Sequence, residues 1–233
     1  MKINITLPYL VAFLSLFFLI NECHDWVHFL VAGLFCRGLG TKGFEGWTFL
    51  TGCSPSGGGQ VLTWISGPAF NYILMWWGWK QMNHLDPSKQ SAGLSLMFAT
   101  LPLARILAAW NGGGDETMVM RMIFGQQRVT GSHGPAIAGL VMVLVLTGPP
   151  LWRAFVILPG WKAKYLAFPA FLYLPILADH AVIRQVLNPL LAERNLSWNL
   201  LPGIPALVMG WGLLCLIIYL ISHQRLRSLM QAA

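Results

Sequence analysis

Residues 8–35 read PYLVAFLSLFFLINECHDWVHFLVAGLF, an apolar run with a short polar cluster inside it. A bilayer core of about 30 Å needs roughly 20 apolar residues in helical form, so this run predicts a membrane-spanning helix. Comparable apolar runs recur along the chain, at 61–79, 91–110, 135–158, 165–186 and 201–221. The sequence therefore predicts an all-α fold, a polytopic transmembrane bundle of about six helices forming one integral membrane domain over residues 1–233.

The composition supports this fold class. Hydrophobic residues make up 56% of the chain and charged residues only 10%, whereas a soluble domain carries roughly a quarter charged residues. The formal net charge is +7, but no run of Lys or Arg accompanies it. The basic residues are therefore expected to contact anionic headgroups of the lipid bilayer, and nucleic acid is excluded as a partner.

The N-terminus resembles a signal peptide, because Lys2 precedes a long apolar stretch. No small-residue cleavage motif follows it, so we expect a retained helix. Of the 15 Lys and Arg residues, eight fall on one side of the predicted spans and six on the other, leaving out Arg105. The positive-inside rule then predicts that both termini lie inside.

The four cysteines show neither a CxxC pair nor a regular framework spacing. Cys23, Cys36, Cys53 and Cys215 are therefore predicted to be small, mostly buried apolar residues. Cys23 is next to His24, but adjacent positions of a helix point about 100° apart, which argues against Cys23 as a ligand to the same metal.

The segment 37–60 is rich in glycine, which a regular helix disfavours. It predicts a loop or a short hairpin after the first helix, able to dip back into the membrane. Within it, Thr51–Gln60 is expected to offer either an edge for an extended peptide or a flexible connector.

The polar cluster in the first helix has the spacing of a metal site. His24 and His28 are four residues apart, so their imidazoles point within about 40° of each other. Asp25 lies about 60° from His28, where its carboxylate can reach a water on the metal. This is the geometry of the HExxH signature of zinc hydrolases. Ionisable residues inside a membrane span are costly and usually functional, so we predict a Zn²⁺ site here.

A catalytic zinc normally takes three protein ligands, so a third must come from elsewhere in the chain. The leading candidate is Asp115, in the Gly-rich break 111–116 after a predicted span. Glu116, Glu22 and His180 remain alternatives.

The order of these features resembles the site-2 protease family of intramembrane zinc metalloproteases. The matching segments are His24-Asp25-Trp26-Val27-His28 followed by Gly33, then Gly67-Pro68-Ala69-Phe70-Asn71, then Asn111 to Asp115. That family has HExxH in one helix, a G-P-x-x-N segment, and an Asp-Gly ligand motif after a later helix. The resemblance covers about residues 7–121, so that 1–121 would be the metalloprotease core and 122–233 additional transmembrane helices.

The resemblance implies specific roles for five residues. His24, His28 and Asp115 would hold zinc, Asp25 would be the general base, and Asn71 would position the substrate or the oxyanion. Two departures from the family pattern stand out. Asp25 replaces the usual Glu and is one methylene shorter, and the usual Leu-Asp-Gly is replaced by Gly-Asp-Glu.

The expected function is that of an intramembrane zinc-dependent endopeptidase, which cleaves a membrane-protein or peptide substrate with metal-activated water. Two alternatives follow from the same residues. One is a catalytically inactive, protease-like binding protein, motivated by Asp25 and the atypical third-ligand motif. The other is a metal or cation transporter, because helices broken by glycine and carrying polar residues line many ion paths.

Overall fold

The computed structural model describes residues 2–125, 133–192 and 198–231. Most of this is helical, which confirms the predicted all-α bundle. The main helices are α1 (Leu7–Cys36), α2 (Gly58–Met82), α3 (Pro87–Ala99), α4 (Pro102–Trp110), α5 (Gly114–Ile123), α6 (His133–Ile157) and α10 (Ala206–Ser222). One long irregular helical stretch consists of α7 (Gly160–Lys162), η1 (Ala163–Ala167), α8 (Phe168–Asp179), η2 (His180–Leu187) and α9 (Asn188–Ala192). The remaining elements are the turn η3 (His223–Ser228) and the strands β1 (Lys2–Ile3), β2 (Asn199–Leu201), β3 (Ile204–Pro205) and β4 (Met230–Gln231).

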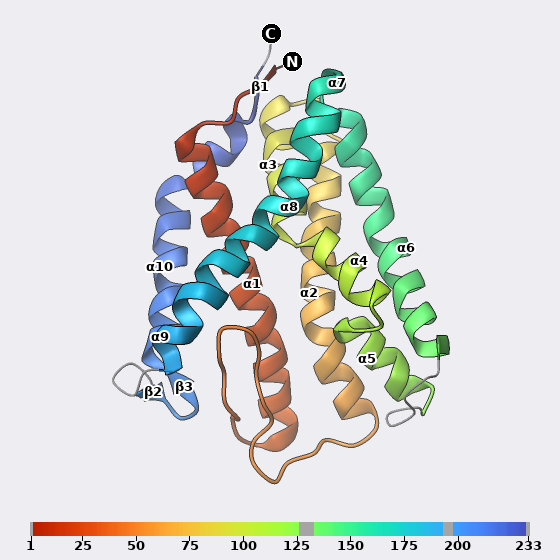
Figure 1. Ribbon diagram of the computed structural model, residues 1–233, viewed down its shortest axis with the longest axis vertical. Coiled ribbons are helices and arrows are strands. Elements are labelled where there is room, and N and C mark those ends of the chain that lie inside the picture. The colour runs from red at the N-terminus through yellow and green to blue at the C-terminus, as the bar shows by residue number, and fades with distance from the viewer. Residues whose placement is uncertain (1, 126–132, 193–197, 232–233) are drawn as a thin grey trace.

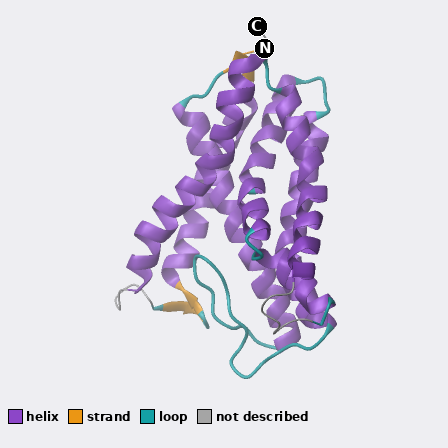
Figure 2. Ribbon diagram, turned by 45° about the vertical axis from the view of Figure 1, so that its right-hand side comes forward, coloured by secondary structure: helices purple, strands orange, loops and turns teal. Residues whose placement is uncertain are grey.

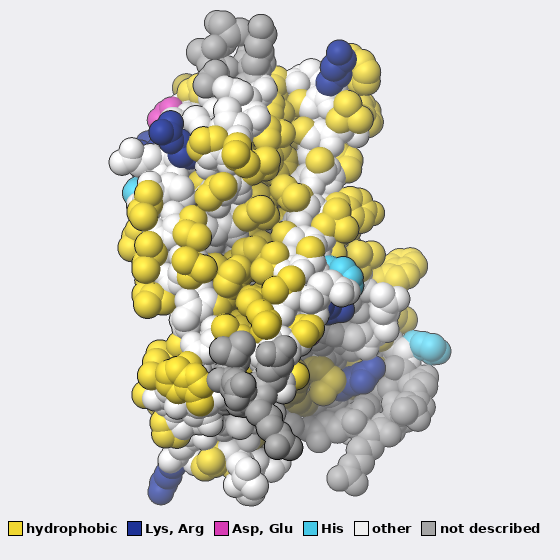
Figure 3. All heavy atoms as spheres, turned by 60° about the vertical axis from the view of Figure 1, so that its left-hand side comes forward, with side chains coloured by type: hydrophobic (Ala, Val, Ile, Leu, Met, Phe, Trp, Pro, Cys, Tyr) yellow, Lys and Arg dark blue, Asp and Glu magenta, His cyan; other side chains and the backbone are white. Residues whose placement is uncertain are grey.

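Five helical segments are long and apolar enough to cross a membrane. They are Leu7–Cys36, Pro87–Trp110, His133–Ile157, Gly160–Ala192 and Ala206–Ser228. The remaining predicted span, 61–79, lies within α2, which has 25 residues but is more polar than these five and includes Thr63, Asn71 and Lys80. Figure 3 shows a broad band of hydrophobic side chains across the middle of one face of the molecule, with charged side chains above and below it.

Both termini lie at the same end of the bundle (Figure 1). There β1 pairs antiparallel with β4, with Lys2 opposite Gln231 and Ile3 opposite Met230. The opposite end carries the loop 37–57 and the antiparallel β2–β3 pair (Figure 2). We refer to these as the terminal end and the loop end.

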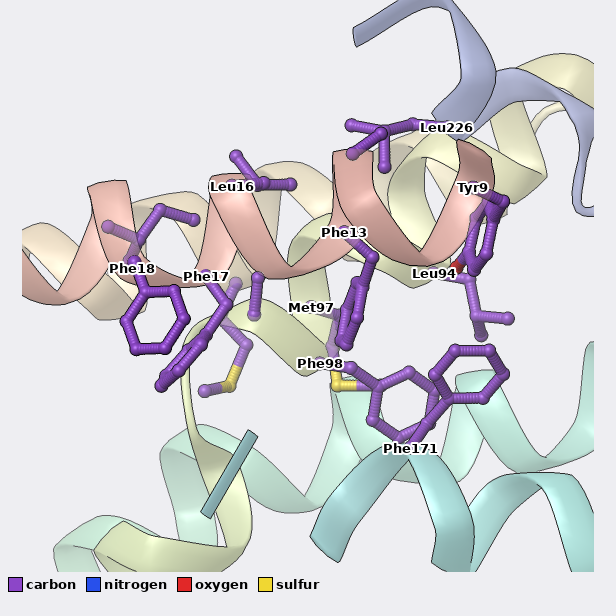
Figure 4. Packing of buried hydrophobic residues seen from close by; sticks show 14 of the residues in the cluster. Tyr9, Phe13, Leu16, Phe17, Phe18, Leu94, Met97, Phe98, Phe171 and Leu226 are labelled. Carbon is purple, nitrogen blue, oxygen red and sulfur yellow. The ribbon is translucent and has the colours of Figure 1, made fainter. Parts of the chain in front are cut away.

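Aromatic packing joins α1 to α3 and α8 near the terminal end (Figure 4). Phe13 and Phe98 both contact Phe171, with ring centroids 5.5 Å and 5.3 Å away. The Tyr9 hydroxyl hydrogen-bonds with the Ser95 hydroxyl at 2.9 Å, which satisfies two buried polar groups. This cluster fixes the half of α1 that precedes the polar residues.

Glycines allow α2 and α3 to pack closely. A Cβ added at Gly78 would lie 2.7 Å from the backbone oxygen of Gly93, so only a residue without a side chain fits there. Close backbone approach through small residues is a common way for helices to associate in membranes. It holds α2 firmly between α1 and α3.

The predicted span 91–110 is broken in two, at the boundary between α3 and α4. Leu101 adopts a left-handed backbone conformation with φ of 57°, and Pro102 begins α4. Proline lacks the N–H that would continue α3, but its fixed φ suits the first position of a new helix. The break sets α4 at an angle to α3 (Figure 1). Arg105, on α4, hydrogen-bonds with Glu116 and His24.

The prediction for the cysteines was wrong for two of the four. Cys36 and Cys53 form a disulfide, with their Cα atoms 5.7 Å apart, while Cys23 and Cys215 are free. The loop 37–57 returns towards the end of α1 and brings the two thiols together, which spacing alone does not reveal.

The same loop contains the predicted short hairpin. Lys42 and Trp47 form an antiparallel bridge, and the Thr48 N–H donates to the Thr41 carbonyl at 2.8 Å. Thr51–Gln60, predicted to be either an edge for an extended peptide or a flexible connector, forms no strand and consists of a turn, a short irregular stretch and the start of α2.

Candidate metal centre

Three metal-binding side chains meet inside the bundle. The Nε2 atoms of His24 and His28 are 3.3 Å apart, and Oδ2 of Asp115 lies 3.2 Å from the first and 3.3 Å from the second. The two histidines come from consecutive turns of α1, and Asp115 comes from the first turn of α5. In the part of the chain that the structure describes, no other group of three or more His, Cys, Asp or Glu side chains is placed to hold a metal.

The spacing of these atoms fits zinc. A tetrahedral Zn²⁺ with bonds of about 2.0–2.1 Å places neighbouring ligand atoms about 3.3 Å apart. The three separations measured here are 3.2–3.3 Å. Two imidazoles and one carboxylate are also a donor set of catalytic zinc sites, which leave a fourth position open. Both the geometry and the chemistry therefore suit a zinc ion.

The ring of His28 is held on several sides. Its Nδ1 donates to the carbonyl oxygen of Thr63 at 2.6 Å, which turns the unprotonated Nε2 towards the other donors. Its ring stacks against Trp47, with centroids 5.5 Å apart, and contacts Trp64 edge-on. A hydrogen bond from the second ring nitrogen is the usual way that proteins orient a metal-binding histidine.

The ring of His24 is oriented by a chain of polar side chains. Nη2 of Arg105 donates to its Nδ1 at 3.1 Å, and Nη1 of the same guanidinium donates to Glu116 at 2.7 Å. The Tyr72 hydroxyl also donates to Glu116, at 2.6 Å. Because a guanidinium can only donate, Nδ1 of His24 accepts, and the proton of the neutral ring lies on Nε2, which donates to Asp115. A metal that binds through Nε2 replaces this proton.

The charge of Asp115 is favoured by its surroundings. Burial alone would raise its pKa, but the contacts with the two histidines, foremost the hydrogen bond from His24, outweigh burial and hold the pKa of the carboxyl below its ordinary value. Its position in the first turn of α5 adds the favourable helix dipole. The ionised form is the one that binds a metal.

The residues considered as alternatives to Asp115 form contacts with other side chains. Glu116 is 2% exposed and binds Arg105 and Tyr72. Glu22 is paired with Lys42 at 2.8 Å, and His180 contacts Gln185 on the surface. Asp115 is therefore the acidic residue that the fold brings to the two histidines.

Asp25 and Asn71 are the two residues expected to act on the substrate. Asp25 is half-buried and forms no hydrogen bond with any residue in the described ranges, yet its carboxylate lies within electrostatic range of His28 and Asp115. Asn71 is 3% exposed, and its Oδ1 is buried without a hydrogen-bond partner among the described residues.

Gly67 connects α2 to the metal centre. A Cβ added at this position would overlap Nε2 of His28 and would lie 2.7 Å from Cε1 of His24. The absent side chain thus leaves space beside the donor nitrogens. Asn71 is one helical turn further along α2, so it lies on the same face of the helix as Gly67.

The sequence did not predict the contacts that hold the loop 37–57 over the site. The Lys42 side chain is fully buried, and its ammonium donates to Glu22 at 2.8 Å and to the Gly43 carbonyl at 3.0 Å. Trp47, from the same hairpin, covers one face of His28. No local sequence signal pairs Lys42 with a carboxylate 20 residues earlier.

Lys42→Met is expected to lower the free energy of unfolding by about 3–5 kcal/mol, because it leaves the Glu22 carboxylate buried without a partner. Lys42→Met combined with Glu22→Gln removes both charges and should recover most of this loss. Thermal unfolding of the two purified variants in detergent measures the difference. Equal melting temperatures for the single and double variants would show that the buried pair does not anchor the loop.

Comparison of the chain with protein-family models, with curated proteins and with solved structures finds no match. The resemblance to site-2 proteases therefore rests on the three quoted segments and stays a prediction. The convergence of His24, His28 and Asp115 does not depend on that resemblance, since it is a property of the fold.

Proposed function

We propose that this protein is a multi-pass integral membrane protein whose metal centre hydrolyses peptide bonds, a zinc-dependent endopeptidase acting on a membrane-protein substrate. The observation that carries the proposal is the meeting of two imidazoles and one carboxylate at tetrahedral spacing, from separate helices of an apolar bundle. Buried ionisable groups at such a depth are expensive unless they serve a function.

The number of membrane crossings follows from the termini. Because β1 and β4 pair at the terminal end, we infer an even number of membrane crossings. Five segments are apolar enough to cross on composition alone, and α2 supplies the remaining passage. Its polar residues are tolerated because Asn71 and Thr63 are buried against other helices.

In this proposal, three residues bind the metal and Asp25 transfers the proton. Zinc bound by His24, His28 and Asp115 would supply a Lewis acid that polarises a carbonyl and activates water. Asp25 accepts a proton from the attacking water as its oxygen bonds to the carbonyl carbon. The same carboxyl then gives the proton to the nitrogen as the C–N bond breaks, so the products are a carboxylic acid and an amine.

Asn71 supports the substrate in this proposal. Its side chain lies on the face of α2 that contacts the histidines, and the amide can donate to a carbonyl oxygen that gains negative charge during the reaction. The unpartnered Oδ1 is a second reason for assigning it a ligand, because this buried acceptor can accept from a backbone N–H of the substrate, and a buried acceptor without a partner is costly.

A cation pathway fits the arrangement less well. Transport requires a succession of sites, whereas the described residues contain a single group of three metal donors. The hairpin and the tryptophans packed over His28 also resemble the cover of a reaction site more than an open path.

Removal of the metal tests the proposal. Purified protein in lipid nanodiscs is expected to hold roughly one zinc ion per chain and to cleave a fluorogenic transmembrane peptide. Treatment with 1,10-phenanthroline should abolish cleavage, and added Zn²⁺ should restore it. Cleavage that persists in zinc-free protein would refute the proposal, and zinc flux into liposomes without cleavage would favour transport.

A further inference from the structure

A second candidate site lies in the same bundle, apart from the metal centre. A cavity of about 570 Å³ lies between α1, α2, α3 and the segment formed by α10 and η3. None of the three metal donors lines it. Cys23 lies at its inner end, and because neighbouring helix positions point about 100° apart, Cys23 faces this cavity while His24 faces the metal site.

The cavity is mostly apolar along its length. Its walls include Leu16 on α1, Leu74 and Trp77 on α2, and Leu96 on α3. The part of α1 between Leu16 and Cys23 is about 10 Å long. The cavity is therefore a mostly apolar slot beside the helices, with Gln81 and His223 among its polar lining residues.

The mouth of the cavity is cationic. Lys89 and Arg227 line it, both are exposed, and neither forms an ion pair with a residue in the described ranges. Asp86 is the carboxylate among the lining residues, and it already accepts the Ser88 N–H at 2.9 Å as the cap of α3. These groups belong to the first turns of α3 and to η3, at the terminal end, where a bundle of this length meets the lipid headgroups.

We propose that this cavity binds one anionic phospholipid. Its phosphate contacts Lys89 and Arg227, and one acyl chain lies along the apolar wall of α1 and α2. Two unpaired cations beside an apolar slot recognise a ligand that has both a negative charge and an apolar chain. A soluble anion lacks the chain, and a neutral lipid lacks the charge.

The size of the cavity favours an acyl chain over a polypeptide helix. A helix about 10 Å across would occupy 570 Å³ in roughly 7 Å of its length, or about five residues. A slot that small accepts no transmembrane helix, but it lies within the range of about 300–1,000 Å³ that small-molecule sites occupy.

Two independent features place this mouth in a leaflet that contains anionic lipid. The elements that reach the terminal end (Figure 1) carry Lys80 in the last turn of α2, Lys89 in the first turn of α3, Lys162 in α7, Lys164 in η1, and Arg225 and Arg227 in η3. The disulfide Cys36–Cys53 lies at the opposite end, as expected for the side that faces an oxidising compartment. Both features assign the terminal end to the cytoplasmic side, whose leaflet carries the anionic lipids.

Native mass spectrometry of the full-length protein tests the proposal. The protein is titrated in detergent with phosphatidylglycerol or phosphatidylcholine of the same chain length. We expect one bound phosphatidylglycerol and a preference over phosphatidylcholine of roughly 25-fold, a factor of about five for each cation. Lys89→Gln combined with Arg227→Gln should abolish this preference. Lys162→Gln combined with Lys164→Gln, which removes two cations from the same end but outside the cavity, should keep it.

A second variant tests the slot itself. Ala92 lines the cavity, so Ala92→Phe should weaken the binding of both lipids by filling the space for the chain. Unchanged zinc content shows that each variant is folded. Equal affinity for the two lipids, an equal loss in the two double variants, or unaltered lipid binding by Ala92→Phe would overturn the proposal. So would a hydrophobic peptide with an acidic end that occupies the site and is not displaced by phosphatidylglycerol.

Discussion

Asp25→Asn is expected to reduce peptide hydrolysis by about 10²–10⁴-fold, the usual contribution of general acid–base catalysis, while the protein keeps its zinc. The substitution preserves the shape of the side chain and removes only its ability to accept a proton. Asp25 forms no hydrogen bond with the described residues, so the substitution breaks no structural contact among them. Zinc analysis and cleavage of the fluorogenic peptide, measured on the same preparation, separate metal binding from turnover.

Two further variants sharpen this experiment. Asp25→Glu keeps the base and adds one methylene, so it should retain activity or increase it if the shorter Asp25 reaches the water imperfectly. His28→Ala removes a metal ligand, so it should lose zinc and activity together. If Asp25→Asn cleaves the peptide as fast as the parent protein, Asp25 is not the general base. If the parent protein binds zinc but does not cleave the peptide, the protein is instead the catalytically inactive binding protein.

The convergence of the three candidate metal donors was predictable from sequence because their geometry is local or nearly so. His24 and His28 share one helix, and their spacing of four residues alone fixes the relative direction of their rings. Asp115 was predicted as the leading third ligand, but Glu116 and Glu22 remained open. The structure separates them because Arg105 and Tyr72 bind Glu116, and Lys42 binds Glu22.

The features that sequence did not predict are long-range. The disulfide Cys36–Cys53 and the pair Glu22–Lys42 both depend on the path of the loop 37–57, which contains little regular structure. The break before Pro102 was also missed, because the hydropathy of 91–110 is continuous although its backbone is not. Apolar periodicity identifies helices, but it does not encode which loop folds back onto which helix.

Gly67→Ala is expected to weaken zinc binding by about 10–100-fold, the usual cost of disturbing the groups that orient metal ligands. The added methyl would overlap Nε2 of His28 and crowd Cε1 of His24. The His28 ring has little freedom to move away, since its Nδ1 is held by the Thr63 carbonyl and its face by Trp47. Isothermal titration of metal-free protein with Zn²⁺ measures the loss.

A matched glycine distinguishes crowding of the metal centre from a general effect on helices. Gly212, inside α10, has nothing within 4 Å of an added Cβ, so Gly212→Ala should leave zinc affinity unchanged. Alanine favours a helix over glycine by up to about 1 kcal/mol, so neither substitution should weaken its helix. A loss of zinc in Gly67→Ala without a matching loss in Gly212→Ala therefore arises at the histidines. If Gly67→Ala instead binds zinc as tightly as the parent protein, α2 does not lie against the two histidine rings. In that case Gly67 does not create the open position beside the metal ligands that hydrolysis requires.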